Sequence, residues 1–239
     1  MNKKTIQIIA LATITLVAVL CAALPGRAQD ANNRYPTSMA PLDQYLMDRN
    51  EEIALARSAA PPAIAKDATV LVLGKNGFET AVTGSNGFVC NVDRSWGDAF
   101  EDTPEFWNPR RRGPVCYNVE AAKTMVPLLM IRTRLALAGK AKAEIKEGLK
   151  AAIEKGELPA IEPGGMSYMM SKQGHLSDHD GHWYPHLMFF APAKDANTWG
   201  ANLPNSPVTG RGAARDPEPI SIFTVTVDKW SDGTDAPSQ

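Results

Sequence analysis

The sequence has almost no excess of charge of either sign. Its 25 lysine and arginine residues face 26 aspartate and glutamate residues, so the formal net charge is −1. Proteins that bind nucleic acid or lie on anionic membranes depend on a basic excess or a polybasic run. The one basic cluster, at residues 110–112, follows several acidic residues, and we expect it to form local ion pairs or a solvated loop. The composition therefore predicts no nucleic-acid partner.

Several short catalytic signatures are missing as well. The chain has no His-Glu-x-x-His pattern, no phosphate-binding loop and no Gly-x-Gly-x-x-Gly turn. Gly165-Met166-Ser167 lacks the second glycine of a nucleophile elbow. The motifs therefore leave open whether the protein is an enzyme.

Residues 1–28 have the three-part pattern of a cleavable secretory signal. Lys3 and Lys4 precede an apolar run over 6–23, and small residues occupy the −3 and −1 positions of a cleavage site after Ala28. Removal of this segment takes three basic residues and no acidic ones, which moves the formal charge from −1 to −4. We therefore expect a periplasmic or extracellular protein without a stable membrane anchor.

The N-terminal segment has two alternative interpretations. An apolar run of about 18 residues is also close to the length of a membrane-spanning helix, but Pro25 and Gly26 break it and favour cleavage. A lipid anchor at Cys21 is disfavoured because Leu20 stands where a lipoprotein signal has a small residue.

Cysteine is scarce, with three residues in the chain. Cys21 would leave with the signal, and Cys90 and Cys116 would remain. In an oxidising compartment an even pair predicts a disulfide. The alternatives are two buried free thiols or a pair of metal ligands.

The rest of the chain predicts one α+β domain. We expect a flexible N-terminus over 29–37, a globular domain over 38–230 and a flexible tail over 231–239. Apolar spacing predicts helices near 39–58, 119–138 and 141–155. Asn-Gly pairs at 76–77 and 86–87 predict two tight hairpins and a three-stranded meander over 69–96. Further strands are expected near 166–171, 186–191 and 220–227, completing an antiparallel sheet.

Histidine is rare, and all four residues lie close together in the sequence: His175, His179, His182 and His186. Asp178 and Asp180 are interleaved with them. Imidazole and carboxylate groups suit transition metals, zinc or another divalent ion among them.

The best candidate pair of ligands is His182 and His186, with His179 or Asp180 as a third, and Asp178 or Glu162 as a base. A catalytic zinc would keep an open position for water. The alternative is that these histidines are packed or solvent-exposed structural residues.

Aromatic residues offer a second kind of site. Trp183, Tyr184 and Trp199 are candidates for a ligand pocket, and the irregular segments 97–116 and 192–219 could form its walls. Core packing is the alternative for each of them.

Four segments resemble a known family. They are Gly84-Ser-Asn-Gly-Phe-Val-Cys90, Arg94-Ser-Trp96, Met170-Ser-Lys-Gln-Gly174 and Gly181-His-Trp-Tyr-Pro-His-Leu-Met-Phe-Phe190. With them the chain resembles a family of exported bacterial proteins that has no assigned activity. The resemblance covers most of the chain after residue 28. It implies export and gives no catalytic role to any residue.

The sequence thus predicts an exported protein of undetermined activity with a metal or small-molecule site at 175–186. The competing interpretation is a non-catalytic binding or accessory module whose histidines are structural. A ligand carrier that uses the aromatic loops is a third possibility.

Overall fold

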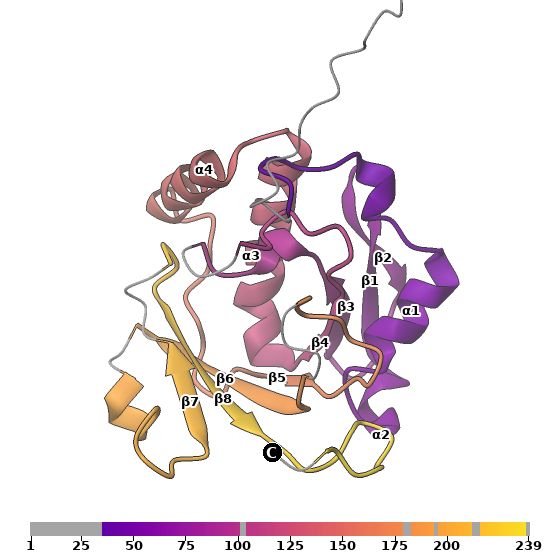
Figure 1. Cartoon of the computed structure of the whole chain (residues 1–239), viewed down its shortest axis with the longest axis vertical. Helices are drawn as coiled ribbons and strands as arrows, with labels where there is room; N and C mark the ends of the chain where they lie inside the picture. Colours follow the sequence, from indigo (N-terminus) through magenta and orange to yellow (C-terminus); the bar gives the residue numbers. More distant parts are fainter. Residues whose placement is uncertain (1–34, 101–103, 179–182, 194–195, 212–215, 238–239) are drawn as a thin grey trace, which may run out of the picture. The chain divides into compact units, whose positions relative to one another are not determined.

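The computed structural model describes residues 35–100, 104–178, 183–193, 196–211 and 216–237 (Figure 1). The expected signal, at 1–28, lies outside them. Within this part the chain forms four α-helices, α1 (Arg49–Arg57), α2 (Pro62–Ala65), α3 (Val119–Leu137) and α4 (Lys142–Glu154). Three short 3-10 helices are η1 (Leu42–Gln44), η2 (Ser95–Gly97) and η3 (Ala196–Trp199).

Eight strands form one mixed sheet, most of it antiparallel, so the α+β prediction is confirmed. The strand order is β2-β1-β3-β4-β5-β6-β8-β7. The strands are β1 (Thr69–Gly74), β2 (Gly77–Val82), β3 (Val89–Asp93), β4 (Gly113–Tyr117), β5 (Met166–Met169), β6 (His186–Pro192), β7 (Val208–Arg211) and β8 (Ile220–Thr226). The strands expected near 166–171, 186–191 and 220–227 are therefore present as β5, β6 and β8.

The predicted meander is wrong in its second half. The Asn76-Gly77 turn does join β1 and β2 as an antiparallel hairpin, but β3 pairs with β1, in parallel, and not with β2. The Asn86 side chain accepts a hydrogen bond from the Phe88 amide (3.0 Å) and donates one to the Ile64 carbonyl (2.8 Å). Asn86-Gly87 is thus a turn that leads the chain across the end of β1.

Gly84 makes this crossing possible. A Cβ atom at Gly84 would lie 2.2 Å from the backbone nitrogen of Thr69 and 2.4 Å from the carbonyl oxygen of Asp67. The chain is held there by the Gly84 amide, which donates to Thr69 Oγ1 (3.0 Å), and by the Ser85 amide, which donates to the Asp67 carbonyl (2.8 Å). Only glycine fits so close to another backbone.

Three further elements differ from the sequence prediction: the helix over 39–58 and the strands β4 and β7. The helix expected over 39–58 is split into η1 and α1, because Asp48 caps α1 by accepting from the amides of Asn50 and Glu51. Strands β4 and β7 lie in segments where the sequence predicted irregular loops. All five residues of β4 are buried, so no alternation marks it in the sequence.

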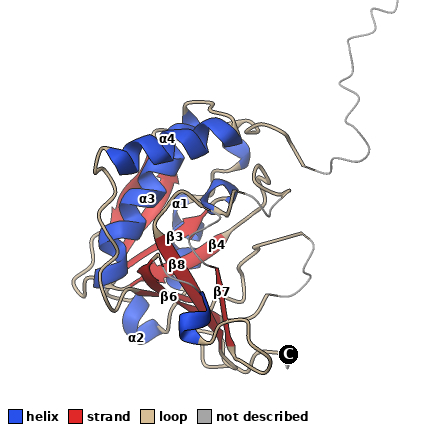
Figure 2. Cartoon of the chain, turned by 90° about the vertical axis from the view of Figure 1, so that its left-hand side faces the viewer, coloured by secondary structure: helices blue, strands red, loops and turns tan. Residues whose placement is uncertain are grey.

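Helices cover both faces of the first half of the sheet. Leu71 and Leu73 share a core with Leu128 and Leu129 of α3, whereas Val70 and Val72 share one with Ala56 of α1. Alternate residues of one strand point to opposite faces, so α1 and α3 lie on opposite sides of β1. Beyond β4 the sheet continues through β5 to β6, β8 and β7, and the last three are labelled in Figure 2.

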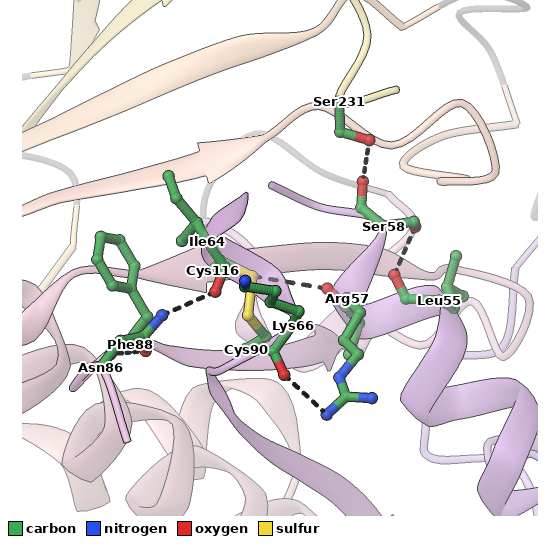
Figure 3. The surroundings of a disulfide bond; sticks show 11 residues. Leu55, Arg57, Ser58, Ile64, Lys66, Asn86, Phe88, Cys90, Cys116 and Ser231 are labelled. Atoms are coloured by element: carbon green, nitrogen blue, oxygen red, sulfur yellow. Dashed lines mark hydrogen bonds between the residues drawn. A yellow bond between two sulfur atoms is a disulfide. The ribbon is translucent and has the colours of Figure 1, made fainter. Parts of the chain in front are cut away.

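The predicted disulfide between Cys90 and Cys116 is confirmed. The two residues are direct partners on the antiparallel strands β3 and β4 (Figure 3). Cys116 Sγ lies 3.7 Å from the carbonyl oxygen of Ala56 in α1. Closing a loop of this length stabilises the fold by about 3–4 kcal/mol in the chain-entropy account.

The described residues after Trp230 make hydrogen bonds to the rest of the fold. Ser231 donates to the Ser58 carbonyl through its hydroxyl (2.6 Å) and to the Met170 carbonyl through its amide (2.9 Å) (Figure 3). Lys172 and Asp232 form an ion pair at 2.9 Å. Near the other end of the described chain, Tyr35 is buried. Across the described ranges, no helix is both long and apolar enough to cross a membrane.

A fully buried ion pair joins α1 to the sheet. The side chains of Glu52 and Arg94 are both 0% exposed, and Arg94 Nη2 donates to Glu52 Oε1 at 2.9 Å. Arg94 Nε also donates to the Tyr45 carbonyl (2.8 Å), and Glu52 Oε1 accepts from the Leu73 amide (3.1 Å). Burial lowers the pKa of Arg94, and the charge of Glu52 opposes that effect.

Replacing Gly84 with alanine should destabilise the protein by about 3 kcal/mol or more, because the added methyl group would overlap backbone atoms. Gly97→Ala is the control, since a Cβ there would have only ordinary contacts, the nearest at 3.7 Å. Urea unfolding of both variants measures the difference. Equal stability of the two variants would show that the chain does not cross β1 at Gly84.

Arg94→Met should destabilise the fold by about 3–5 kcal/mol, because it leaves the Glu52 carboxylate buried without its partner. The double variant Glu52→Leu/Arg94→Met removes both charges and should recover a large part of that loss. Chemical unfolding of wild type, both single variants and the double variant gives the coupling free energy. Strictly additive losses would contradict a buried pair.

Candidate functional site

The structure describes only part of the histidine segment. His179, Asp180 and His182, three of the four candidate metal ligands, lie outside the described residues. His186, the fourth, is the first residue of β6, and His175 and Asp178 lie in the segment before it. Among the described residues no group of three or more His, Cys, Asp or Glu side chains could hold a metal ion.

The His186 ring is held in one orientation. Its Nδ1 lies 2.9 Å from the carbonyl oxygen of Tyr184, and the edge of the Trp183 ring meets it at right angles with ring centroids 5.4 Å apart. A carbonyl can only accept a hydrogen bond, so Nδ1 carries the proton of the neutral ring and the lone pair is on Nε2. Burial lowers the pKa of His186 from its usual 6.5, against the weaker effect of the Tyr184 carbonyl. The ring is therefore neutral at pH 7.

His175 belongs to a separate cluster of charged and polar residues, the Glu105–Asp178 cluster (Glu105, Asn108, Arg110, His175 and Asp178). Nε2 of His175 lies 2.7 Å from Asp178 Oδ1. The other oxygen of Asp178 binds the guanidinium of Arg110 and accepts from the Asn108 amide at 3.1 Å. One imidazole nitrogen of His175 is thus already engaged by a carboxylate.

Glu105 holds the same segment from the opposite side. Its carboxylate accepts from the Ser177 hydroxyl (2.8 Å), the Asp178 amide (3.0 Å) and the Asn108 side chain (2.8 Å). Burial alone would raise the pKa of Glu105, but these hydrogen bonds outweigh it, and the pKa lies below the usual 4.5. Hydrogen bonds stabilise the ionised form in this way.

The carboxylates also act on their neighbours. Burial would raise the pKa of Asp178, but hydrogen bonds from His175 and Arg110 lower it below 3.8. Burial, followed by the charges of Glu105 and Asp178, raises the pKa of Tyr35 to about 12. Both carboxylates are ionised at neutral pH, and Tyr35 remains a phenol.

Backbone pairing completes the attachment of this segment. The amide of Arg112 donates to the His175 carbonyl and the amide of His175 donates to the Arg112 carbonyl, both at 2.8 Å. The start of the histidine segment is therefore bound to residues 105–112. Of the basic cluster at 110–112, Arg111 does pair with an upstream acid, Asp98, at 3.0 Å, whereas Arg110 pairs with Asp178.

The candidate base Glu162 is exposed in the loop before β5. No hydrogen bond or ion pair within the described residues joins its side chain to a histidine. Asp178, the other candidate base, is occupied by His175 and Arg110.

The aromatic candidates do not converge on one pocket. Trp183 packs beside His186 and lies so close to Gly174 that a Cβ there would be 2.5 Å from the indole ring. Trp199 is 46% exposed and stacks on Phe223, with centroids 4.3 Å apart. Phe223 is paired with Phe189, which lies on the opposite face of β6 from His186. Tyr184 contributes its carbonyl oxygen to the His186 ring.

Sequence reasoning did not connect Glu105, Asn108 and Arg110 with the histidines. These residues are about 70 positions from Asp178, and no local pattern links the two segments. In the sequence these three residues look like ordinary loop residues. Only the folded chain, in which the segment before β4 lies against the segment after β5, brings them to Asp178.

Glu105→Gln should lower the free energy of unfolding at pH 7 by about 1–3 kcal/mol, the range for hydrogen bonds to a charged group. The pKa of Glu105 is lower in the folded protein than its usual 4.5. The stabilisation that the ionised carboxylate provides is therefore present above pH 4.5 and is lost as the pH falls through the pKa of the folded protein. The difference between variant and wild type should therefore shrink between pH 5 and pH 3. Glu162→Gln, at an exposed glutamate, is the control and should change stability little. A difference that does not depend on pH would contradict the ionised role of Glu105.

Comparison of the chain with protein-family models, curated proteins and solved structures gave no match in any of the three.

Proposed function

We propose that the protein is exported and binds a divalent transition metal, zinc or a metal of similar preference, through the segment 175–186. The observation that carries the proposal is the hydrogen bond from His186 Nδ1 to the Tyr184 carbonyl. In metal-binding histidines the ring nitrogen that does not bind the metal usually donates such a hydrogen bond, which fixes the tautomer and the orientation of the ring. Burial keeps the ring neutral, which a metal ligand requires.

The attachment of the segment supports the same proposal. His175 is bound to Arg112 before the segment, and His186 enters β6 after it. His179, Asp180 and His182 stand between these two fixed points in the sequence. With His186 they supply the donor types that zinc takes, three imidazoles and a carboxylate.

Export is supported by two features of the chain. The N-terminal pattern at 1–28 is typical of a secretory signal, and the Cys90–Cys116 disulfide is typical of an oxidising compartment. Both features agree with the resemblance to a family of exported bacterial proteins.

An alternative function is a binding or accessory module in which the histidines are structural. The observation that favours it is His175, whose Nε2 is satisfied by Asp178 and whose backbone pairs with Arg112. A hydrolytic enzyme would need an open metal position that activates a water molecule, together with a base. Of the two candidate bases, Asp178 is already bound by His175 and Arg110, and Glu162 is exposed.

The metal proposal predicts about one equivalent of bound metal in the purified protein after equilibration with zinc. His182→Ala/His186→Gln should lose it, because the variant removes the two best ligands. His175→Ala is the matched control and should keep its metal, since Asp178 already occupies its Nε2. Elemental analysis and calorimetric titration measure the stoichiometry, with circular dichroism to show that each variant is folded.

Two outcomes would contradict the metal proposal. The first is wild-type protein that takes up no zinc. The second is a folded His182→Ala/His186→Gln variant that binds as much zinc as wild type, which would leave the histidines as structural residues.

A further inference from the structure

A cleft of about 340 Å³ opens on the sheet beyond α3, over β6, β8 and β7. Its lining consists of Met188, Asn202, Thr209, Gly210, Arg211, Ile222 and Thr224. Figure 1 shows these three strands at the end of the sheet opposite β1 and β2. The cleft shares no residue with the Glu105–Asp178 cluster.

The strand register shows that the floor of the cleft is regular. Met188, Thr224 and Thr209 are cross-strand partners and form one row, and Phe190, Ile222 and Arg211 form the next. Side chains two positions apart on a strand share a face. The floor therefore combines apolar side chains from β6 and β8 with hydroxyl groups, and it carries a guanidinium at one side.

Arg211 provides the only positive charge among the described lining residues. It is exposed, and within the described part of the chain no hydrogen bond or ion pair engages its guanidinium. A planar guanidinium matches a carboxylate, which accepts two parallel hydrogen bonds from arginine. Of the two threonines beside it, Thr209 donates its hydroxyl to the Thr224 carbonyl (3.4 Å), so recognition of a carboxylate depends on Arg211. The apolar side chains of Met188 and Ile222 match a hydrocarbon body.

The outer edge of β7 is closed to another strand. Asn202 donates from its side-chain amide to the Gly210 carbonyl (2.8 Å) and accepts from the Gly210 amide (3.1 Å). Its own amide donates to the Val208 carbonyl (2.9 Å). The outward-facing groups that a peptide or a second copy would need for strand pairing are already occupied. The volume of the cleft is at the lower end of the range for small-molecule sites.

The geometry points to a binding site for a small carboxylate with an apolar body, held with its carboxylate on Arg211 and its hydrocarbon part over Met188 and Ile222. The site is independent of the metal proposal. His186 lies on the same face of β6, one row before Met188, but no part of the carboxylate site requires it.

The test uses hexanoate as the probe and hexanol as its uncharged counterpart, added to the purified, isotope-labelled protein. Amide chemical shifts should change in a saturable way on β6, β7 and β8, with hexanol at least about 10-fold weaker because it lacks the charge. Arg211→Gln should weaken hexanoate about 10-fold, the size expected for a charge-assisted hydrogen bond at an accessible site. Arg134→Gln removes an exposed arginine that pairs with Glu157 and should have no effect.

Adding EDTA separates this site from the proposed metal site. Binding that persists in EDTA and depends on Arg211 supports the carboxylate site. Binding abolished by EDTA would place the carboxylate on a metal and overturn it. Three other results would overturn it as well. They are equal affinity for hexanoate and hexanol, an Arg211→Gln variant with the hexanoate affinity of wild type, and chemical shifts that change with protein concentration and not with hexanoate.

Discussion

The buried pair of Glu52 and Arg94 sets the arrangement on which the other elements depend. It links α1 to β1 through Leu73, to the end of β3 through Arg94, the residue that follows that strand, and to the segment before α1 through Tyr45. A charge without its partner at this depth would cost several kcal/mol, so the helix can occupy only the position in which both groups meet. The disulfide then joins β3 to β4 on the same face, beneath α1. The first half of the sheet is fixed by these two constraints together.

The candidate site depends on this rigid half through β4. Residues 105–112 lead directly into β4, and they carry the carboxylate and the backbone groups that hold His175, Ser177 and Asp178. On the other side of the segment, His186 is paired with Met169 on β5 and Thr226 on β8. The two described ends of the histidine segment are thus bound to two parts of one sheet. A site built on strands is positioned more accurately than a site on a free loop.

Much of the fold follows from local patterns, and the differences arise where long-range contacts decide. Caps and turns are local signals: Asn118 caps α3 by accepting a hydrogen bond from the Ala121 amide, and Asn76-Gly77 makes the first hairpin as predicted. The parallel pairing of β3 has no such signal, because the second Asn-Gly pair, Asn86-Gly87, serves a crossover in which Gly84 packs against another backbone. Glu52 reads as a solvent-facing charge in an amphipathic helix, and only its distant partner Arg94 explains its burial. For the site, the histidine segment was evident from composition, whereas its attachment to Glu105 and Arg110 had no signal in the sequence.

The bonds made by Ser231 have a consequence for how the chain reaches its final state. They join the end of α1 to a residue 173 positions later, and Lys172 is tied to Asp232 in the same region. Contacts of such separation raise contact order and require the whole intervening chain to be present. A chain that emerges N-terminus first cannot complete the packing around α1 until residue 231, beyond the last strand β8, has appeared.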